Sequence, residues 1–327
     1  MEKQLDKRFA GCLRGYRIVF RSPRSRPNTA CRKDLSRARE HCIQAEKLLK
    51  GAPHAALSRA HFSLAWIEIW RVNAAEGLPA ARRALEIGEA LKDERLQAAA
   101  LAAVAGCLWG RGKLREAYEL FDASWEMGDR SKDLQAIGNA ISMGSFSLAY
   151  LTDIRALKAW VSRELAKPRQ EKNPGRSILL HFAVIGHMRA GDTTAARRVQ
   201  SECESNYPGT AKLNSACLHY AEANFESAEA RYCSYLNFAR QQGRRENVCC
   251  YGLELGRLQI NLGKFDDARR VLSEVLSIAN EGGHVPFQLN AWEGLAHTYV
   301  RMNRLDDARS ALARCHEIIS DGEDWRG

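Results

Sequence analysis

The hydrophobic positions of residues 247–319 form one pattern that is written twice, with Ala268 and Ala308, 40 residues apart, at equivalent places. Each copy predicts two amphipathic helices, because small and apolar residues return at helical spacing on either side of a short turn. The turns carry Gly263 and Asn303, the residue types that best tolerate a left-handed helix end. A fixed period of this size predicts a solenoid of stacked helical hairpins.

A small residue follows the predicted turn of every hairpin. A small side chain is needed there because the second helix crosses its own first helix closely. The eight predicted repeat positions are Ala38, Ala81, Ala117, Ala156, Ala196, Ala228, Ala268 and Ala308. The 43-residue spacing from Ala38 to Ala81 is the longest, and it predicts a longer loop around residues 73–77.

These positions divide the chain into a single helix at residues 34–49 and about seven helix pairs. The predicted pairs cover residues 55–92, 97–127, 134–166, 175–205, 211–242, 247–281 and 287–319. The sequence therefore predicts an all-α, right-handed superhelical solenoid in which each unit packs on its neighbours. The predicted organisation is a basic arm at 1–33, a helical repeat array at 34–320 and a tail, or the start of a further repeat, at 321–327.

The last repeat resembles the tetratricopeptide (TPR) pattern. The matching residues are Trp292, Leu295, Ala296, Tyr299, Leu305 and Ala308. Two departures are mild: Asn303 replaces the turn glycine and Cys315 replaces the last small residue. Most units are nearer 40 residues than the usual 34 or so. In this the array resembles the TPR-like region of large bacterial regulators, including MalT-like, LuxR-type transcription activators and arrays that follow adenylate cyclase or AAA ATPase domains.

The resemblance implies a non-enzymatic regulatory array that binds a protein or peptide in a concave groove lined by the first helices. Carried over to this sequence, it implies these groove residues: Trp66, Trp109, Tyr220, Arg257, His297 and Arg301. The tryptophans can instead fill gaps between neighbouring units, and the charged residues can instead form a solvated face. The resemblance also leaves open a small-molecule effector site. Both ends look cut, which suggests a fragment of a larger signalling or transcription-regulating protein.

The formal net charge of +10 is concentrated at the amino terminus, where residues 1–33 hold ten Lys or Arg and two acidic residues. The composition of this arm predicts disorder, and contact with nucleic-acid phosphates is the alternative. Ten scattered cysteines without a CxxC pair predict free thiols in a cytoplasmic protein. The sequence contains no phosphate-binding loop, HExxH or GxSxG motif, so we expect no catalytic site, metal or cofactor. The longest uncharged run, 134–152, contains several polar residues, which argues against a membrane span.

Overall fold

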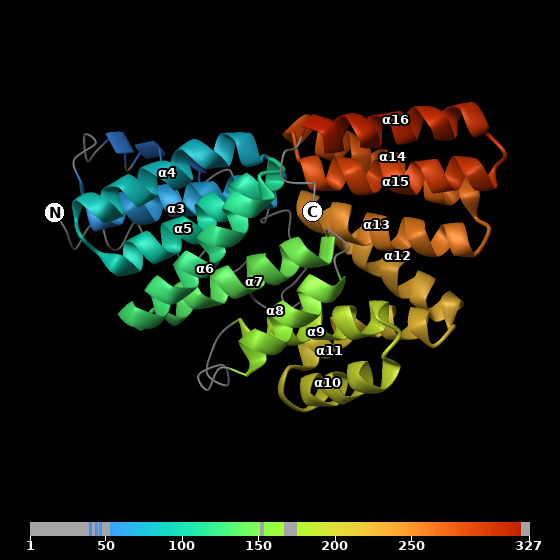
Figure 1. Ribbon diagram of the computed structural model, residues 1–327, viewed down its shortest axis with the longest axis horizontal. Helices are drawn as coiled ribbons and strands as arrows, with labels where there is room; N and C mark the ends of the chain where they lie inside the picture. Colours follow the sequence, from blue (N-terminus) through green and yellow to red (C-terminus); the bar gives the residue numbers. More distant parts are fainter. Residues whose placement is uncertain are drawn as a thin grey trace.

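The computed structural model describes residues 39–40, 43–44, 46–47, 53–150, 154–166 and 175–321 (Figure 1). From residue 53 onward these contain fourteen helices and no strand. The helices are α3 (Ala55–Trp70), α4 (Ala74–Ala90), α5 (Glu94–Gly110), α6 (Leu114–Ser131), α7 (Leu134–Tyr150), α8 (Ile154–Leu165), α9 (Arg176–Arg189), α10 (Thr193–Asn206), α11 (Pro208–Ala221), α12 (Phe225–Gln242), α13 (Arg245–Asn261), α14 (Phe265–Gly282), α15 (Val285–Arg301) and α16 (Leu305–Asp321).

The helices form seven consecutive hairpins, α3–α4 to α15–α16, and this confirms the predicted all-α solenoid of about seven pairs. Each second helix packs against its own first helix and against the first helix that follows. The single helix predicted at 34–49 lies largely outside the described residues, although the six residues described there are helical. The arm at 1–33 lies wholly outside them.

A left-handed residue ends the first helix in six of the seven hairpins, and the turn between α7 and α8 lies outside the described residues. These residues are Val72, Gly112, Gly191, Ala223, Gly263 and Asn303, with φ between 56° and 79°. The backbone N–H of the next residue then donates to a carbonyl in the last helical turn, as from Lys264 to Gln259 at 2.9 Å. This hydrogen bond satisfies a carbonyl that the helix end would otherwise leave unpaired. The hairpins are therefore closed by backbone geometry that Gly and Asn favour.

The repeat position of the first hairpin is Gly77, so the assignment of Ala81 was wrong. The N–H of Gly77 donates to the carbonyl of Asn73, as the N–H of Ala117 donates to that of Lys113. A Cβ at residue 77 would lie 3.2 Å from the carbonyl oxygen of Ala65, so α4 passes close to the backbone of α3 at this position. Helix α4 begins at Ala74, and the longer loop predicted at 73–77 does not exist. Ala81 is buried one turn further along.

The other described repeat positions lie early in the second helices, as predicted. Ala117, Ala196, Ala228 and Ala268 are fully buried and Ala308 is 3% exposed, whereas Ala156 is half-buried. Ala38 is outside the described residues. Small side chains at these crossings let one continuous core run through the units from α3 to α15.

The superhelix closes on itself. Helix α13 contacts α3, and α15 contacts both α5 and α7, although α13 and α15 belong to the last two hairpins and α3, α5 and α7 to the first three. Figure 1 shows α13–α16 beside α3–α5, with α8–α11 completing the arc below them. The first helices line the inside of this arc, and neighbouring ones pack side by side except α11 and α13. The inner surface is therefore partly filled by contacts between the two ends.

Candidate functional site

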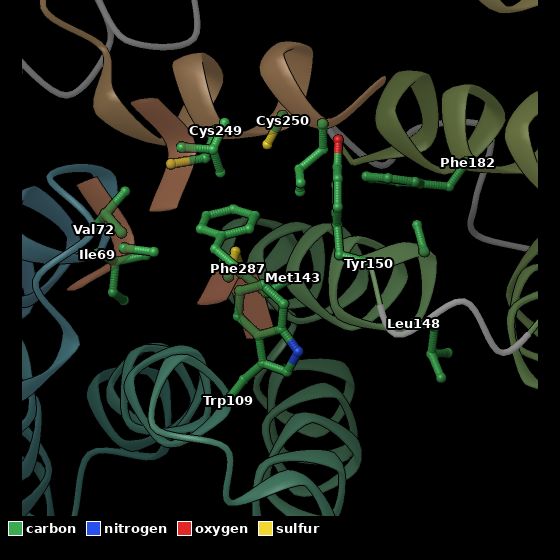
Figure 2. Packing of buried hydrophobic residues seen from close by; sticks show 14 of the residues in the cluster. Ile69, Val72, Trp109, Met143, Leu148, Tyr150, Phe182, Cys249, Cys250 and Phe287 are labelled. Atoms are coloured by element: carbon green, nitrogen blue, oxygen red, sulfur yellow. The ribbon is translucent and has the colours of Figure 1, made fainter. Parts of the chain in front are cut away.

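Five aromatic rings from α5, α7 and the start of α15 join the two ends of the array. Phe287 is fully buried, and its ring centroid lies 6.0 Å from that of Trp109 and 5.8 Å from that of Tyr150. Phe146 lies 5.2 Å from Trp109 in an edge-to-face contact. His284 stacks on Phe287 at 4.2 Å. Figure 2 shows Trp109, Tyr150 and Phe287 converging below Cys249 and Cys250 of α13.

The joint between α14 and α15 lies directly against the first hairpin. A Cβ on Gly282 would come 1.5 Å from the carbonyl oxygen of Val72, so the two backbones touch. Val72 is fully buried and holds φ 60°, a conformation that is unfavourable for a β-branched side chain. A strained residue persists where its surroundings fix it. This contact is therefore a close-fitting backbone junction between the first and sixth hairpins.

His284 begins α15 and accepts a hydrogen bond from the N–H of Phe287 through Nδ1 at 3.4 Å. Its side chain lies between aromatic rings and is shielded from water, and this burial lowers the pKa of His284 to about 3. The imidazole is therefore neutral near pH 7, which suits its role as a hydrogen-bond acceptor at the helix start.

Next to the aromatic cluster lies a group of polar side chains, which we call the inner polar cluster: Arg189, Glu254, Arg257 and Asn290. Glu254 accepts hydrogen bonds from Arg189 at 2.7 Å and from Arg257 at 3.3 Å. Arg257 also donates to Asn290 at 2.6 Å. Arg189 donates to the carbonyl of Ala149, and Asn290 donates to that of Tyr150 at 2.7 Å. The cluster thus connects α7, α9, α13 and α15.

Two carboxylates, of Glu254 and Glu293, lie within 4.0 Å of the two guanidinium groups of this cluster. Burial alone would raise the pKa of Glu254, but the charges of Arg189 and Arg257, with the hydrogen bond from Arg189, lower it. The ionised carboxylate of Glu254 therefore forms ion pairs with both guanidinium groups. The carboxylate of Glu293, whose side chain is half exposed, lies 4.0 Å from Arg257. The side chains of Arg189, Glu254 and Arg257 are 21%, 24% and 30% exposed. The cluster is thus a polar site that solvent reaches.

A second polar group lies on α9, α10 and α11. His181 and Asn214 are in hydrogen-bond contact at 2.5 Å, and Asn214 donates to Gln200 at 3.0 Å. Burial lowers the pKa of His181, although its contact with Asn214 opposes the effect. Because each of these groups has a partner, this network stabilises the packing of three helices.

In the part of the chain that the structure describes, few side chains are suited to act as a nucleophile or to bind a metal ion. Burial raises the pKa of the Cys107 thiol to about 12 and that of Cys203 to about 11, so both stay protonated and unreactive. The cysteines described are free. The described residues contain no group of three or more His, Cys, Asp or Glu that would hold a metal ion. No described helix is both long and apolar enough to cross a membrane.

The predicted groove residues do not form one site. Trp66 is 2% exposed and packs between Phe62 and Trp70, with centroids at 6.0 and 6.1 Å. Trp109 is 1% exposed within the aromatic closure. Both tryptophans therefore belong to the core in this structure, not to an open groove surface.

The remaining four predicted residues retain accessible surface. Arg257 belongs to the inner polar cluster. Tyr220 is 37% exposed, and its hydroxyl accepts a hydrogen bond from Asn261 at 2.5 Å. His297 is exposed, and so is Arg301, whose guanidinium lies 5.5 Å from the ring centroid of Phe265.

Sequence reasoning missed Arg189, Glu254 and Asn290. The three-residue spacing of Glu254 and Arg257 on one helix was a signal for that pair. No local signal identifies Arg189, because its partner Glu254 is 65 residues away.

A tetratricopeptide repeat family model matches residues 249–321, the last two hairpins apart from the start of α13. No curated protein matches the chain. Among solved structures, a Rap protein complexed with competence and sporulation factor has a TM-score of 0.58 and 11% identity, covering 98% of this chain and 100% of that chain. The apo form of RapI gives a TM-score of 0.48 and 13% identity, covering 94% and 99%.

The family match over residues 249–321, the Rap protein with a TM-score of 0.58 and the repeated hairpins show a TPR-like helical-repeat fold. At 11% identity the likeness to the Rap protein concerns the fold alone.

Proposed function

We propose that this chain is a non-enzymatic helical-repeat protein that binds a protein or peptide segment at the inner polar cluster. The observation that carries the proposal is the pair of guanidinium groups, Arg189 and Arg257, that donate to the same carboxylate oxygen of Glu254 on the inner surface. Arginine is well suited to bind a carboxylate through two parallel hydrogen bonds. A segment with an acidic side chain or a free terminal carboxylate would compete with Glu254 and the half-exposed Glu293 for these two groups.

The surroundings of the cluster suit such a segment. The buried amide of Asn290 holds Arg257 against the end of α7, and the exposed Tyr220, whose hydroxyl accepts from Asn261, offers a further polar group. Side chains of this kind can pair with the backbone of an extended peptide. The solved Rap protein with a TM-score of 0.58 is itself complexed with a factor, which supports a binding role for this fold.

A regulatory role follows from where the cluster lies. The same four side chains connect α7 and α9 to α13 and α15, so a ligand that competes for Arg189 or Arg257 alters the contact between the middle hairpins and the last two hairpins of the array. A change in superhelix closure is then passed to whatever is attached to either end. This is the mechanism expected of a regulatory array within a larger bacterial signalling or transcription-regulating protein.

The test is selection of binders from a random peptide library displayed on phage, with the full chain as bait. We expect enriched peptides with a conserved acidic position, whose affinity falls at least tenfold for Arg257→Ala and less for Arg257→Lys. Arg240→Ala is the matched control, because Arg240 pairs with Glu274 on α14, away from the cluster. Peptides that bind wild type and Arg257→Ala equally well would refute the proposed site.

A small-molecule effector is the second candidate, because a cavity of about 290 Å³ lies at the start of the array. Its charged lining is Arg39, Glu46, His61, Glu68, Glu76 and Arg83. Nε2 of the buried His61 has no hydrogen-bond partner and lies 3.8 Å from the carboxylate of Glu46. A thermal-shift screen with sugars and nucleotides tests this candidate: a shift retained in Arg257→Ala and lost in His61→Ala would favour it over the peptide.

A further inference from the structure

We propose that the cavity at the start of the array binds a small organic cation that carries a primary ammonium group. The proposal rests on the second candidate function and names the chemical class of its effector. The cavity, of about 290 Å³, is lined by Arg39, Glu46 and residues of α3 and α4, at the amino-terminal side of the array (Figure 1). None of its lining residues belongs to the inner polar cluster, so ligands of the two sites can be told apart.

The two guanidinium groups of the lining already have carboxylate partners. Nε of Arg39 lies 3.4 Å from the carboxylate of Glu68, whose side chain is 5% exposed. Nη1 of Arg83 donates to the carboxylate of Glu86 at 2.9 Å. Each arginine thus has a carboxylate of its own within the protein, and an anionic ligand would have to compete with that carboxylate.

Glu46 and Glu76 are the acidic residues of the lining that remain. Both are exposed, and neither is paired with a lysine or an arginine in the part of the chain that the structure describes. Together with Glu68 they give the lining three carboxylates against two guanidinium groups. A site with this balance of charge attracts a cation and repels an anion.

His61 adds a buried polar atom that lacks a partner. Its side chain is 9% exposed, and its Nε2 has no hydrogen-bond partner and lies 3.8 Å from the carboxylate of Glu46, too far for a hydrogen bond. Burial lowers the pKa of His61, although Glu46 opposes the effect, so the imidazole is neutral near pH 7. A buried polar atom without a partner is uncommon in a native protein, and a ligand that enters between His61 and Glu46 would satisfy it.

A primary ammonium group matches these acceptors. It offers three hydrogen-bond donors and no acceptor, whereas a carboxylate only accepts and a neutral imidazole can accept through one nitrogen. Leu64, Pro79 and Ala80 complete the lining and provide apolar contact for a short carbon chain. A metal ion fits less well, because no three His, Cys, Asp or Glu side chains of the described residues are grouped as its ligands.

The test is isothermal titration calorimetry of the full chain with n-butylamine, 1,4-diaminobutane, butyrate, glucose and AMP. We expect both amines to bind, with dissociation constants on the order of 1 mM or below, and we expect no binding of butyrate. Glu46→Gln and Glu76→Gln combined should weaken amine binding by about tenfold, because two ion pairs with the ammonium group are lost. Glu89→Gln is the matched control, since Glu89 is exposed on α4 but does not line the cavity.

The double variant keeps the proposal testable even if His61→Ala does not fold, because Glu46 and Glu76 are exposed. The proposal is wrong if butyrate binds as tightly as n-butylamine, or if the double variant binds the amines as wild type does. If glucose or AMP binds through His61 and the amines do not bind, the amine class is wrong and the second candidate function stands. If none of the compounds binds, this proposal fails, whereas the peptide site is tested separately by Arg257→Ala.

Discussion

The backbone junction between Gly282 and Val72 makes one glycine decisive for the closed superhelix. Gly282→Ala would place a methyl group 1.5 Å from the Val72 carbonyl oxygen. No side-chain rotation relieves that overlap, because both partners belong to the backbone. The variant must therefore separate the α14–α15 joint from the first hairpin.

The expected loss can be estimated from what the contact buries. Separation gives water access to Trp109 and Phe287, which are now 1% and 0% exposed. Each large apolar side chain loses about 1.5–3 kcal/mol when fully exposed, so complete opening costs about 3–6 kcal/mol. Alanine is a better helix former than glycine by up to about 1 kcal/mol, and that small gain acts in the opposite direction. We therefore expect a net loss of about 2–5 kcal/mol.

Gly283→Ala is the matched control at the adjacent residue. Gly283 has φ 61°, and a Cβ there meets nothing within 4 Å. Its substitution carries only the left-handed backbone penalty, about 1–2 kcal/mol. The control thus changes the same joint without pushing the two ends apart.

Two measurements on both variants check this reasoning. Urea unfolding followed by circular dichroism gives the free energy of unfolding, and hydrogen exchange reports on residues 108–112 and 284–290. We expect faster exchange in both segments for Gly282→Ala only. If Gly282→Ala is as stable as wild type and its exchange is unchanged, the two ends are not in contact as described.

Three further predictions concern stability. His284 has a pKa of about 3 in the folded protein and about 6.5 in the unfolded chain, so between these values the unfolded chain binds more protons. The contribution of His284 to the free energy of unfolding is therefore complete above pH 6.5 and falls by up to about 1.4 kcal/mol per pH unit below it. In urea unfolding at several pH values, His284→Asn should remove this pH dependence. Because the pKa of Glu254 is lowered in the folded protein, its ionised carboxylate stabilises the fold above the unfolded carboxyl pKa of about 4.5, and this contribution is lost as the pH falls through the folded pKa. The difference in free energy of unfolding between wild type and Glu254→Gln should therefore shrink below pH 4.5. Ala223 holds φ 58° at an exposed hairpin turn, so Ala223→Gly should raise the melting temperature, with a gain of up to about 1 kcal/mol.

The hairpins could be predicted from the sequence because each is encoded locally. The helical period, the turn residue and the small repeat residue all lie within one unit, as in Phe265–Gly282 and its preceding turn at Gly263. The first repeat position was misassigned for the same reason. Ala81 offers a small residue one turn after Gly77, and only the backbone hydrogen bond of Gly77 shows which of them occupies the crossing.

The closure and the inner polar cluster could not be predicted, because both depend on contacts between distant segments. The sequence around Gly282 and Gly283 is that of an ordinary joint, and nothing in it indicates contact with Val72. Trp109 has the spacing of a groove residue, but closure converts that position into core. Groove prediction from a repeat pattern holds only where the superhelix stays open.

The most direct test of the closed superhelix is photo-crosslinking from the first hairpin. A benzophenone amino acid in place of Arg71, which is exposed and adjacent to Val72, should attach to the tryptic peptide 271–301 that contains Gly282 and Gly283. Gly282→Ala should greatly reduce this product. Crosslinks confined to α3–α6 in the wild-type chain would show that the two ends lie apart and would contradict the account.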